Sequence, residues 1–557
     1  MKRVCSKYLL PGILCILGVC VLLSLLFFSG GPGYTMIEPS AEMQEMSAGI
    51  TQETQVRLND IAADLQSLAG DLRNYTPADP EAENILYRFY ERYPNAVAVA
   101  WVDAKTGTSL TAPALSLTDI LASPEIARLG ESSFGRDSLL LIGPISSESQ
   151  GMIPCFVTPV YDSNDEYTGF VLLPYVVSLL QQSIDVPHTG TANLWTDVWV
   201  INSKGTLISH PDTGAIGQNL YLGYFVDRHP ELRDGLFYII EHPAGSIMYR
   251  AYDLSGTQIV EKTGVWQTIV FGGQELRIVT EQYPIPEVAY PYVGNTTEDE
   301  QKQLVHAMRR YAKQEGTDKA VAEFNDPNGA FSGTGYNLFA YTMDGTTLVS
   351  AKSALIGAER LNYHDAYGLR PVDTMIIRAD QGGGYVHYYR IVPYTVDQAA
   401  FTISYLLPVN EKWFVGASRA VSAVPQTYTI SKREAVTRAA MTIHDWVTSY
   451  GEEAALAMLM EPGRGLPEGT EWILAVSYNG TLLADTTRPD TIGEDVFSLT
   501  DLHGTSIIRE SVVMAKQGGG YMYLEKDTEG PDEGTIFLVY VEPVDDTWCI
   551  LSATRLD

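Results

Sequence analysis

The chain has 557 residues, of which 45% are hydrophobic and 19% charged, and its formal net charge is −31 at pH 7. This length suggests three to four domains, and the composition is typical of a globular protein with ample material for sizeable cores. So acidic a chain is not expected to bind a nucleic-acid backbone or an anionic membrane surface.

A membrane anchor is predicted near the N-terminus. Lys2, Arg3 and Lys7 precede residues 9–28, a run of twenty residues without a charge. At about 1.5 Å per residue, a helix of this length spans about 30 Å, the thickness of the hydrocarbon core. The basic flank predicts that the N-terminus is cytoplasmic and the bulk of the chain extracytoplasmic. A cleavable signal peptide is the competing interpretation, but its apolar region is usually shorter, about 7–15 residues.

The segment after the anchor predicts a long helix from about Ser40 to Leu72, because its apolar residues recur every three to four positions. These residues are Leu58, Ile61, Leu65, Leu68 and Leu72. A coiled-coil seam that joins two chains is the alternative use of this stripe. A second helix (80–93), strands (96–107, 152–162, 166–175 and 198–211) and an apolar helix that ends near 184 are also expected.

Residues 324–420 recur in outline at 461–555. Gly345 and Gly480 are 135 apart (480 − 345), while the pairs Gly357/Gly493, Asp365/Asp501 and Gln381/Gln517 are each 136 apart. A period of this length indicates a duplicated domain and not a solenoid repeat of 20–50 residues.

Each copy carries hairpin and bend signals. Apolar strands end in Asp344-Gly345 and Asn479-Gly480, which favour the primed turns of hairpins because both need a positive φ. Three glycines at 382–384 and again at 518–520 predict a bulge or tight bend before an aromatic strand.

A helix with a start signal precedes each copy. Thr297 with Glu300, and Ser431 with Glu434, match a capping box. Each copy is therefore predicted to be a long helix laid on one face of an antiparallel sheet.

Together these motifs resemble the Cache family of extracytoplasmic sensor domains with PAS-like sheets. The matching segments are a long helix, DPNG (326–329), DGT (344–346), IG (356–357), GGGY (382–385) and Pro408 followed by Trp413. The resemblance implies two single-Cache type 2 domains. Residues 41–282 resemble a double-Cache module, because Gly205 and Gly217 precede their counterparts in the next unit by 140.

The resulting fold class is α+β: tandem Cache domains, each with an antiparallel sheet backed by a long N-terminal helix, behind a transmembrane helix. The expected boundaries are 1–36 for the stub and anchor, 37–283 for the double-Cache-like module (subdomains about 84–184 and 185–283), 284–296 for a linker, 297–425 for one single-Cache-like domain and 426–557 for the other.

Enzyme chemistry is not expected. The sequence has no phosphate-cradling glycine loop, nucleophile elbow or paired metal-ligand helix, so no catalytic residue, metal or cofactor is predicted. The pairs His364-Asp365 and Asp501/His503 hold equivalent places in the two copies, and loop capping or ligand hydrogen bonding is their expected use. Cys155 and Cys549 are expected to be buried thiols in separate domains.

A small-molecule-binding role fits better, because a sheet with long connections in front forms a concave pocket. The expected ligand-binding residues of the domain at 297–425 are Tyr341, Arg360, Asn362, Asp365, Tyr388 and Tyr405, with Arg360 binding a carboxylate through two hydrogen bonds. The second copy has Val496 in place of Arg360 and is expected to be a spacer.

The resemblance also implies a ligand site in the membrane-distal part of a double-Cache module. Trp101, Asp103 and Tyr161 are the candidates there. Family members that bind amino acids carry an aspartate after the strand that corresponds to 169–174, where this chain has Pro174, so an amino-acid ligand is not favoured.

We therefore expect a single-pass cell-membrane protein that binds a small molecule outside the cell. Because no output domain is apparent, a separate transducer is the expected partner. The alternative hypothesis is a non-catalytic stalk or adhesion protein of stacked Cache folds, and a homodimer through the N-terminal helix is an open arrangement for either.

Overall fold

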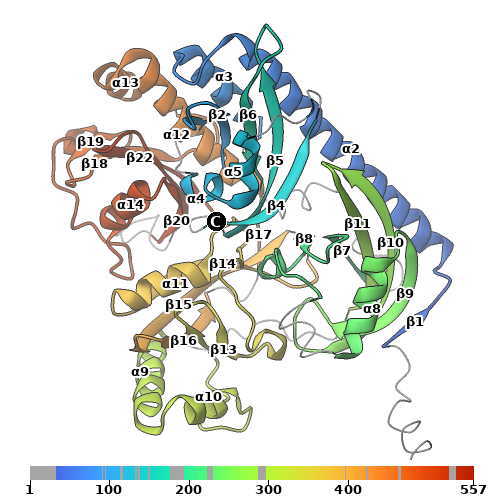
Figure 1. Cartoon of the computed structure of the whole chain (residues 1–557). Helices are drawn as coiled ribbons and strands as arrows, with labels where there is room; N and C mark the ends of the chain where they lie inside the picture. The colour runs from blue at the N-terminus through green and yellow to red at the C-terminus, as the bar shows by residue number, and fades with distance from the viewer. Residues whose placement is uncertain are drawn as a thin grey trace, which may run out of the picture.

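The computed structural model describes residues 33–556 except 91, 94–95, 113–116, 132–134, 136–137, 148–150, 176–193, 222–229, 286–295, 396, 422–424, 462–465 and 526–534. Four antiparallel sheets follow one another along the chain, each with helices against it (Figure 1), so the predicted α+β class is confirmed. We call them unit 1 (sheet of β2–β6), unit 2 (β1 and β7–β11), unit 3 (β12–β17) and unit 4 (β18–β22). The predicted domain boundaries stay predictions.

The elements of units 1 and 2 are β1 (Tyr34–Met36), α2 (Ala41–Asp71), η1 (Leu72–Asn74), α3 (Pro80–Tyr90), β2 (Val99–Asp103), β3 (Ser109–Ala112), α4 (Thr118–Leu121), α5 (Pro124–Glu131), β4 (Leu140–Ser147), β5 (Gly151–Tyr161), β6 (Tyr167–Pro174), β7 (Leu194–Asn202), β8 (Leu207–Ser209), η2 (Thr213–Ala215), α8 (Pro230–Glu241), β9 (Gly245–Tyr252), β10 (Ile259–Phe271) and β11 (Gln274–Pro284). The predicted helix that ends near 184 lies outside the described residues.

The elements of units 3 and 4 are α9 (Glu298–Glu315), α10 (Thr317–Asn325), β12 (Asn337–Thr342), β13 (Thr347–Ser350), η3 (Ser353–Leu355), α11 (Pro371–Asp380), β14 (Gly384–Ile391), β15 (Gln398–Asn410), β16 (Trp413–Ala420), β17 (Gln426–Thr427), α12 (Ile430–Tyr450), α13 (Glu452–Leu459), β18 (Trp472–Ser477), β19 (Leu482–Asp485), η4 (Pro489–Thr491), α14 (Ile507–Lys516), β20 (Gly520–Glu525), β21 (Ile536–Pro543) and β22 (Trp548–Arg555).

All four sheets share one strand order. It is β3-β2-β6-β5-β4 in unit 1, β13-β12-β16-β15-β14 in unit 3 and β19-β18-β22-β21-β20 in unit 4. Unit 2 has the order β8-β7-β11-β10-β9, and β1 extends it at the edge beside β9. Apart from β1 and β17, which pairs with β15, the first strand of each unit therefore lies between the second and the last.

The repeated Ile-Gly motif folds in the same way in three units. The N–H groups of Gly217, Gly357 and Gly493 donate to a carbonyl oxygen of β8, β13 and β19, at 2.8, 2.7 and 2.8 Å. The φ angles of these glycines are 84°, 85° and 91°, a region that residues with a Cβ rarely adopt. The repeat in the sequence therefore marks a turn that the backbone requires.

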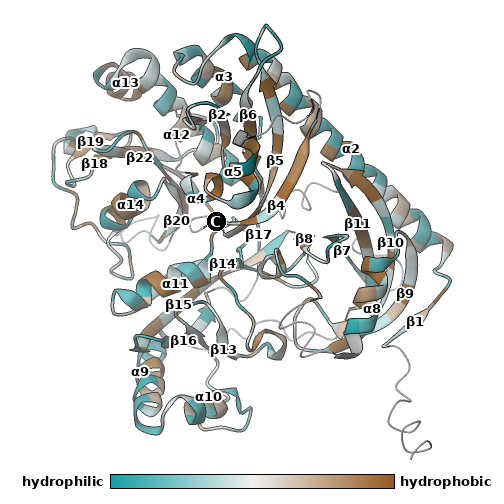
Figure 2. Cartoon of the chain, viewed as in Figure 1, coloured by the Kyte–Doolittle hydropathy of each residue, from teal (hydrophilic) through white to brown (hydrophobic). Residues whose placement is uncertain are grey.

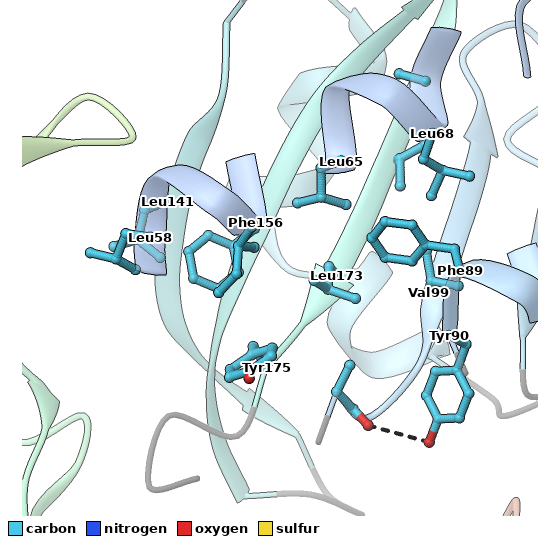
Figure 3. Close-up of a cluster of buried hydrophobic side chains, with 14 of the residues drawn as sticks. Leu58, Leu65, Leu68, Phe89, Tyr90, Val99, Leu141, Phe156, Leu173 and Tyr175 are labelled. Carbon is cyan, nitrogen blue, oxygen red and sulfur yellow. Dashed lines mark hydrogen bonds between the residues drawn. The ribbon is translucent and has the colours of Figure 1, made fainter. Parts of the chain in front are cut away.

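One helix, α2, supports both unit 1 and unit 2 (Figure 1). Ser40 caps it by accepting a hydrogen bond from the Met43 N–H at 3.1 Å. The predicted stripe from Leu58 to Leu72 is buried among side chains of both sheets, and Leu65 is 0% exposed. Figure 3 shows this core, where Leu58, Leu65 and Leu68 meet side chains of α3, β4, β5 and β6. Because the chain's own sheets cover the stripe, the alternative prediction that it forms a coiled-coil seam between two chains is wrong.

The long helices α9 and α12 back the sheets of units 3 and 4. The predicted capping box of α9 is confirmed, since Thr297 and Glu300 bond each other's backbone N–H. The predicted cap of α12 at Ser431 is wrong. The helix begins at Ile430, and Thr429 accepts a hydrogen bond from the Ser431 N–H at 3.2 Å.

Hydrophobic residues run along strands such as β4, while the helices also carry hydrophilic residues (Figure 2).

Cys155 and Cys549 are free and buried in different units, as predicted. The predicted membrane span at 9–28 lies outside the described residues. In the part of the chain that the structure describes, no helix combines the length and hydropathy needed to cross a bilayer.

Candidate functional site

The three residues predicted in unit 1 lie on β2 and β5, which both pair with β6. Trp101 is 2% exposed and packs in the core shared with α2, on the helix side of the sheet. Asp103 closes the turn after β2 by accepting hydrogen bonds from the N–H groups of Lys105 (2.9 Å) and Thr106 (2.7 Å). Tyr161 is half-buried at the end of β5. Their ligand-binding role stays a prediction.

Arg360 and Asn362 lie where unit 3 meets units 1 and 2. Arg360 was predicted to bind the carboxylate of a ligand. In the structure it pairs with a carboxylate of the chain itself, since its Nη1 lies 2.8 and 2.6 Å from the two carboxylate oxygens of Asp212. Asn362 accepts a hydrogen bond from the Met152 N–H at 2.6 Å and donates to the carbonyl oxygen of Thr213 at 3.0 Å. Both side chains are therefore occupied by contacts between units.

Asp365 is also fully engaged. One oxygen accepts from the N–H groups of Tyr367 and Leu369, both at 2.9 Å. The other accepts from the Tyr389 N–H at 3.0 Å and from the Tyr523 hydroxyl of unit 4 at 2.7 Å. Burial raises the pKa of Asp365 to about 6. The expected loop-capping use of this aspartate is what the geometry shows.

The three tyrosines predicted in unit 3 lie on both faces of its sheet. Tyr341 and Tyr388 pack on the α11 side with Met375 and Phe414. Tyr405 packs on the side of α9. Of the six predicted residues of unit 3, Tyr341, Arg360 and Tyr388 do lie near one another, since besides burial both Arg360 and Tyr388 act on the pKa of Tyr341, whereas Tyr405 is on the opposite face of the sheet.

A denser polar group lies in unit 2. Trp195, Asp197, Lys262, Glu281 and Tyr283 are on adjacent strands, with Asp197 opposite Glu281 and Trp195 opposite Tyr283. Along β7 the alternate residues Val198 and Val200 face α2, so Asp197 faces the other side, as Trp199 does towards α8. We call the five residues the unit 2 cluster.

The side chains of this cluster bond one another. Lys262 Nζ lies 2.8 Å from Glu281 Oε2 and 4.6 Å from the centre of the Tyr283 ring. Asp197 accepts hydrogen bonds from Trp195 Nε1 at 2.8 Å and from the Tyr283 hydroxyl at 2.5 Å. The charged residues Asp197, Lys262 and Glu281 are 6%, 8% and 5% exposed.

Burial dominates the electrostatics of the unit 2 cluster. It raises the pKa of Glu281, and the neighbouring charge of Asp197 raises it further. Burial also lowers the pKa of Lys262, against the attraction of Asp197 and Asp253. Charged groups this deeply buried are costly to fold, and they gather at functional sites more often than elsewhere.

Two further tyrosines border the cluster. Tyr249 stands opposite Lys262 in the sheet, and its ring crosses Gly264, the residue opposite Glu281. The buried Tyr249 hydroxyl has no hydrogen-bond partner among the described residues. Tyr394 of unit 3 packs edge-on against Trp195 at 5.6 Å between ring centres and has a φ of 63°. A side chain in this backbone region is uncommon and is held there by its surroundings.

The unit 2 cluster was not predicted from the sequence, because its residues belong to no motif that recurs between units. A signal was available. Asp197 interrupts the largely apolar and aromatic segment 194–201, and the period of two predicts that it can face inward. Lys262 and Glu281 have polar neighbours in the sequence and carry no such signal.

A surface groove of about 510 Å³ lies between α2 and α3. Its charged residues include Glu81 and Arg88, which form an ion pair at 2.8 Å with side chains at least half exposed. Within the described ranges, no group of three or more His, Cys, Asp or Glu side chains is arranged to hold a metal ion.

The chain was compared with known proteins. None of the curated proteins matches it. Among solved structures, an extracellular ligand binding receptor from Desulfohalobium retbaense DSM5692 is 20% identical with a TM-score of 0.35, covering 44% of this chain and 40% of that one. The alignment thus spans less than half of the receptor's length.

Two chemoreceptor domains align over similar lengths. The periplasmic sensory domain of Campylobacter jejuni Tlp1 is 13% identical with a TM-score of 0.32, covering 42% of this chain and 92% of that one. The ligand-binding domain of the Pseudomonas aeruginosa PAO1 amino acid chemoreceptor PctC, in complex with GABA, is 15% identical with a TM-score of 0.31, covering 42% and 95%.

The family comparison agrees with the repeated motifs and with the shared strand order. The model of single Cache domain 2 matches twice, over residues 292–433 and 419–556, which are units 3 and 4 with their helices. Residues 292–556 therefore belong to the Cache-domain family.

Proposed function

We propose that this protein is a membrane-anchored, extracytoplasmic, non-enzymatic sensor-type protein that binds a small molecule at the unit 2 cluster. The observation that carries the proposal is the burial of Asp197, Lys262 and Glu281 on the sheet face away from α2, beside an unpartnered Tyr249 hydroxyl. Burying three ionisable groups on one strand face is costly, and binding of a polar ligand beside them would account for their presence.

Thermal-shift screening of the full chain against small carboxylates, amines and purines tests ligand binding. A ligand at a hundredfold excess over its dissociation constant stabilises the protein by about 2.7 kcal/mol, which raises the melting temperature. Asp197→Asn is expected to remove this shift, whereas Lys204→Met, at an exposed lysine of the same unit, is expected to keep it. A shift that survives Asp197→Asn unchanged would place the ligand elsewhere.

Tyr249→Phe locates the site more sharply, because it removes one hydroxyl and keeps the ring. That hydroxyl has no partner, so the variant is expected to be at least as stable as the parent protein without ligand and to bind more weakly. The matched control is Tyr283→Phe, which removes the hydrogen bond to Asp197. It is expected to lose about 1–3 kcal/mol of unfolding free energy.

Anchoring by residues 9–28 is part of the same proposal and rests on the apolar length and the basic flank. Protease added to intact cells is expected to degrade units 1 to 4. If these units were protected from the protease, they would lie in the cytoplasm and the proposed orientation would be wrong. A separate transducer stays a prediction.

A stalk of stacked Cache folds is the second candidate. It is favoured by the use of Arg360, Asn362 and Asp365 in contacts between units. Absence of any thermal shift across the screen would support the stalk and oppose the sensor.

A further inference from the structure

Units 3 and 4 contact each other through equivalent residues. His387 and Tyr523 correspond (523 − 387 = 136), as do Asp365 and Asp501 (501 − 365 = 136). The Tyr523 hydroxyl of unit 4 donates to Asp365 of unit 3 at 2.7 Å, and His387 Nδ1 of unit 3 lies 3.9 Å from Asp501 Oδ2 of unit 4. Such reciprocal contacts are those of a twofold dimer, formed here within one chain.

The starts of the two long helices take part in the same reciprocal pattern. Glu298 and Arg433 are equivalent first-turn residues of α9 and α12 (433 − 298 = 135). Arg433 Nη1 donates to the carbonyl oxygen of Tyr367 across the interface at 2.8 Å. Glu298 Oε1 lies 3.0 Å from Nδ1 of His503, the counterpart of Tyr367. The Arg433 side keeps its charge at every physiological pH, whereas the His503 side titrates.

His503 is enclosed by groups from both units, and its side chain is 1% exposed. Its Nε2 lies 2.8 Å from Glu525 Oε2, and its ring centre lies 4.6 Å from that of His387. The titratable and charged groups around the two histidines are Glu298 (α9), Arg378 (α11), Tyr385 (β14), Arg419 (β16), Asp501 (the loop of His503), Glu510 (α14) and Glu525 (β20).

We propose that His503, Glu298 and His387 form a pH-dependent latch between units 3 and 4, which holds them together most firmly in mildly acidic solution and loosens on either side. Closing the latch places a protonated His503 between carboxylates of both units. Closing also takes His387, in its neutral form, out of water.

We call the loss of stability of the closed latch on each side of its optimum pH the alkaline limb and the acidic limb. The alkaline limb comes from His503. Burial alone lowers its pKa, but the hydrogen bond to Glu525 and the charges of Glu298, Glu525 and Asp501 outweigh burial and raise it above 6.5. The closed state therefore keeps a proton that the open state has released. This contribution is complete below pH 6.5 and is lost as the pH rises through the raised pKa.

The acidic limb comes from His387. Burial, followed by the charge of His503, lowers its pKa from 6.5 to about 3. Opening lets His387 take up a proton, so the latch weakens as the pH falls below 6.5. Burial raises the pKa of Asp501 and Glu510, and it raises the pKa of Asp365, which contacts Tyr523 across the same interface, to about 6. Proton uptake by these carboxylates in the closed state opposes the acidic limb, so the histidine variants are needed to assign the response between pH 5.5 and 8.5.

Hydrogen exchange of the full chain, followed by mass spectrometry at pH 5.5, 6.5, 7.5 and 8.5 with times scaled to the intrinsic rates, tests the latch. The reporters are peptides that cover loop 500–505 and the first turn of α9. Their protection is expected to be greatest near pH 6.5 and to fall on each side by up to tenfold per pH unit, the limit for one proton. Protection that is flat across this range would overturn the proposal.

Variants assign the two limbs. His503→Gln is expected to flatten the alkaline limb and His387→Gln the acidic one. Glu298→Gln changes a carboxylate that is one-third exposed, so it reports the same alkaline limb without removing a buried ring. The control is His444→Gln, since His444 pairs with Glu542 inside unit 4 at 3.1 Å, and it should keep both limbs. An alkaline limb that is the same in His503→Gln and Glu298→Gln as in the parent chain would disprove the assignment.

Discussion

Replacing Arg360 by methionine tests whether this residue joins two units or binds a ligand. Its side chain is 7% exposed and its guanidinium holds the Asp212 carboxylate, whose side chain is 30% exposed. Removing one partner of a fully buried ion pair costs about 3–5 kcal/mol, because a charge is left without compensation. Asp212 keeps some contact with water and a hydrogen bond from the Gly214 N–H, so we expect Arg360→Met to cost about 2–3 kcal/mol.

Urea-induced unfolding of the full chain measures this cost in a double-mutant cycle with Asp212→Asn. The two changes are expected to couple by about 2 kcal/mol, since each removes the same contact. The midpoint of the same transition is compared in all four proteins, because a chain of several units need not unfold in one step. Against burial, Arg360 holds the pKa of Asp212 at about 2. The coupling should therefore be complete above pH 3.8 and lost as the pH falls towards 2.

A coupling below about 0.5 kcal/mol would refute this reasoning. If Arg360→Met is as stable as the parent protein and also abolishes a ligand-induced thermal shift, Arg360 binds a ligand carboxylate, as the sequence analysis expected. The same set of variants therefore decides between the two roles.

Three further outcomes follow from burial. Leu65→Ala should cost about 2–5 kcal/mol by calorimetry or urea unfolding, because Leu65 is 0% exposed beneath α2; a cost under 1 kcal/mol would mean that this core collapses freely. Asp365→Asn should lower stability by about 1–3 kcal/mol, and a Tyr523→Phe background should reduce that loss. Iodoacetamide at pH 8 should leave Cys155 and Cys549 unlabelled until urea unfolds the chain, since burial raises the pKa of both thiols; rapid native labelling at either would contradict their burial.

Local features were predictable because neighbouring residues determine them. The hairpins after β12 and β18, the bends at the glycine triplets and the Thr297 cap each depend on a few adjacent residues. At Gly383, for example, a Cβ would lie 2.4 Å from the Leu406 carbonyl oxygen. The predicted type of hairpin turn is wrong, because Gly345 and Gly480 have a positive φ (83° and 92°) but Asp344 and Asn479 do not. The error at α12 has the same local origin, because Thr429 and Ser431 are two hydroxyl residues that can both start the helix.

Contacts between units were not predictable from local patterns. Arg360 and Asp212 are 148 positions apart and meet only because unit 3 packs on unit 2. The residue type was right for a carboxylate, but no periodicity or turn signal distinguishes a ligand's carboxylate from one supplied by another unit. The unit 2 cluster escaped for the opposite reason, since its charged residues belong to no repeated motif and become neighbours only when three strands align.

The reciprocal contacts explain why repeated polar residues misled the search for a ligand site. When a duplicated domain pairs with its own copy through a twofold axis, the same position of each copy contributes to the interface. An interface residue is therefore repeated in the sequence just as a ligand-binding residue would be. Asp365 and Asp501 show this, as both close a loop and both face the other unit. Positions where the two copies differ then carry the functional difference. Glu298 against Arg433 and His387 against Tyr523 place both histidines of the interface on one side. The other side carries Asp365, whose pKa burial raises to about 6, so substitutions on each side separate the two contributions to the pH response.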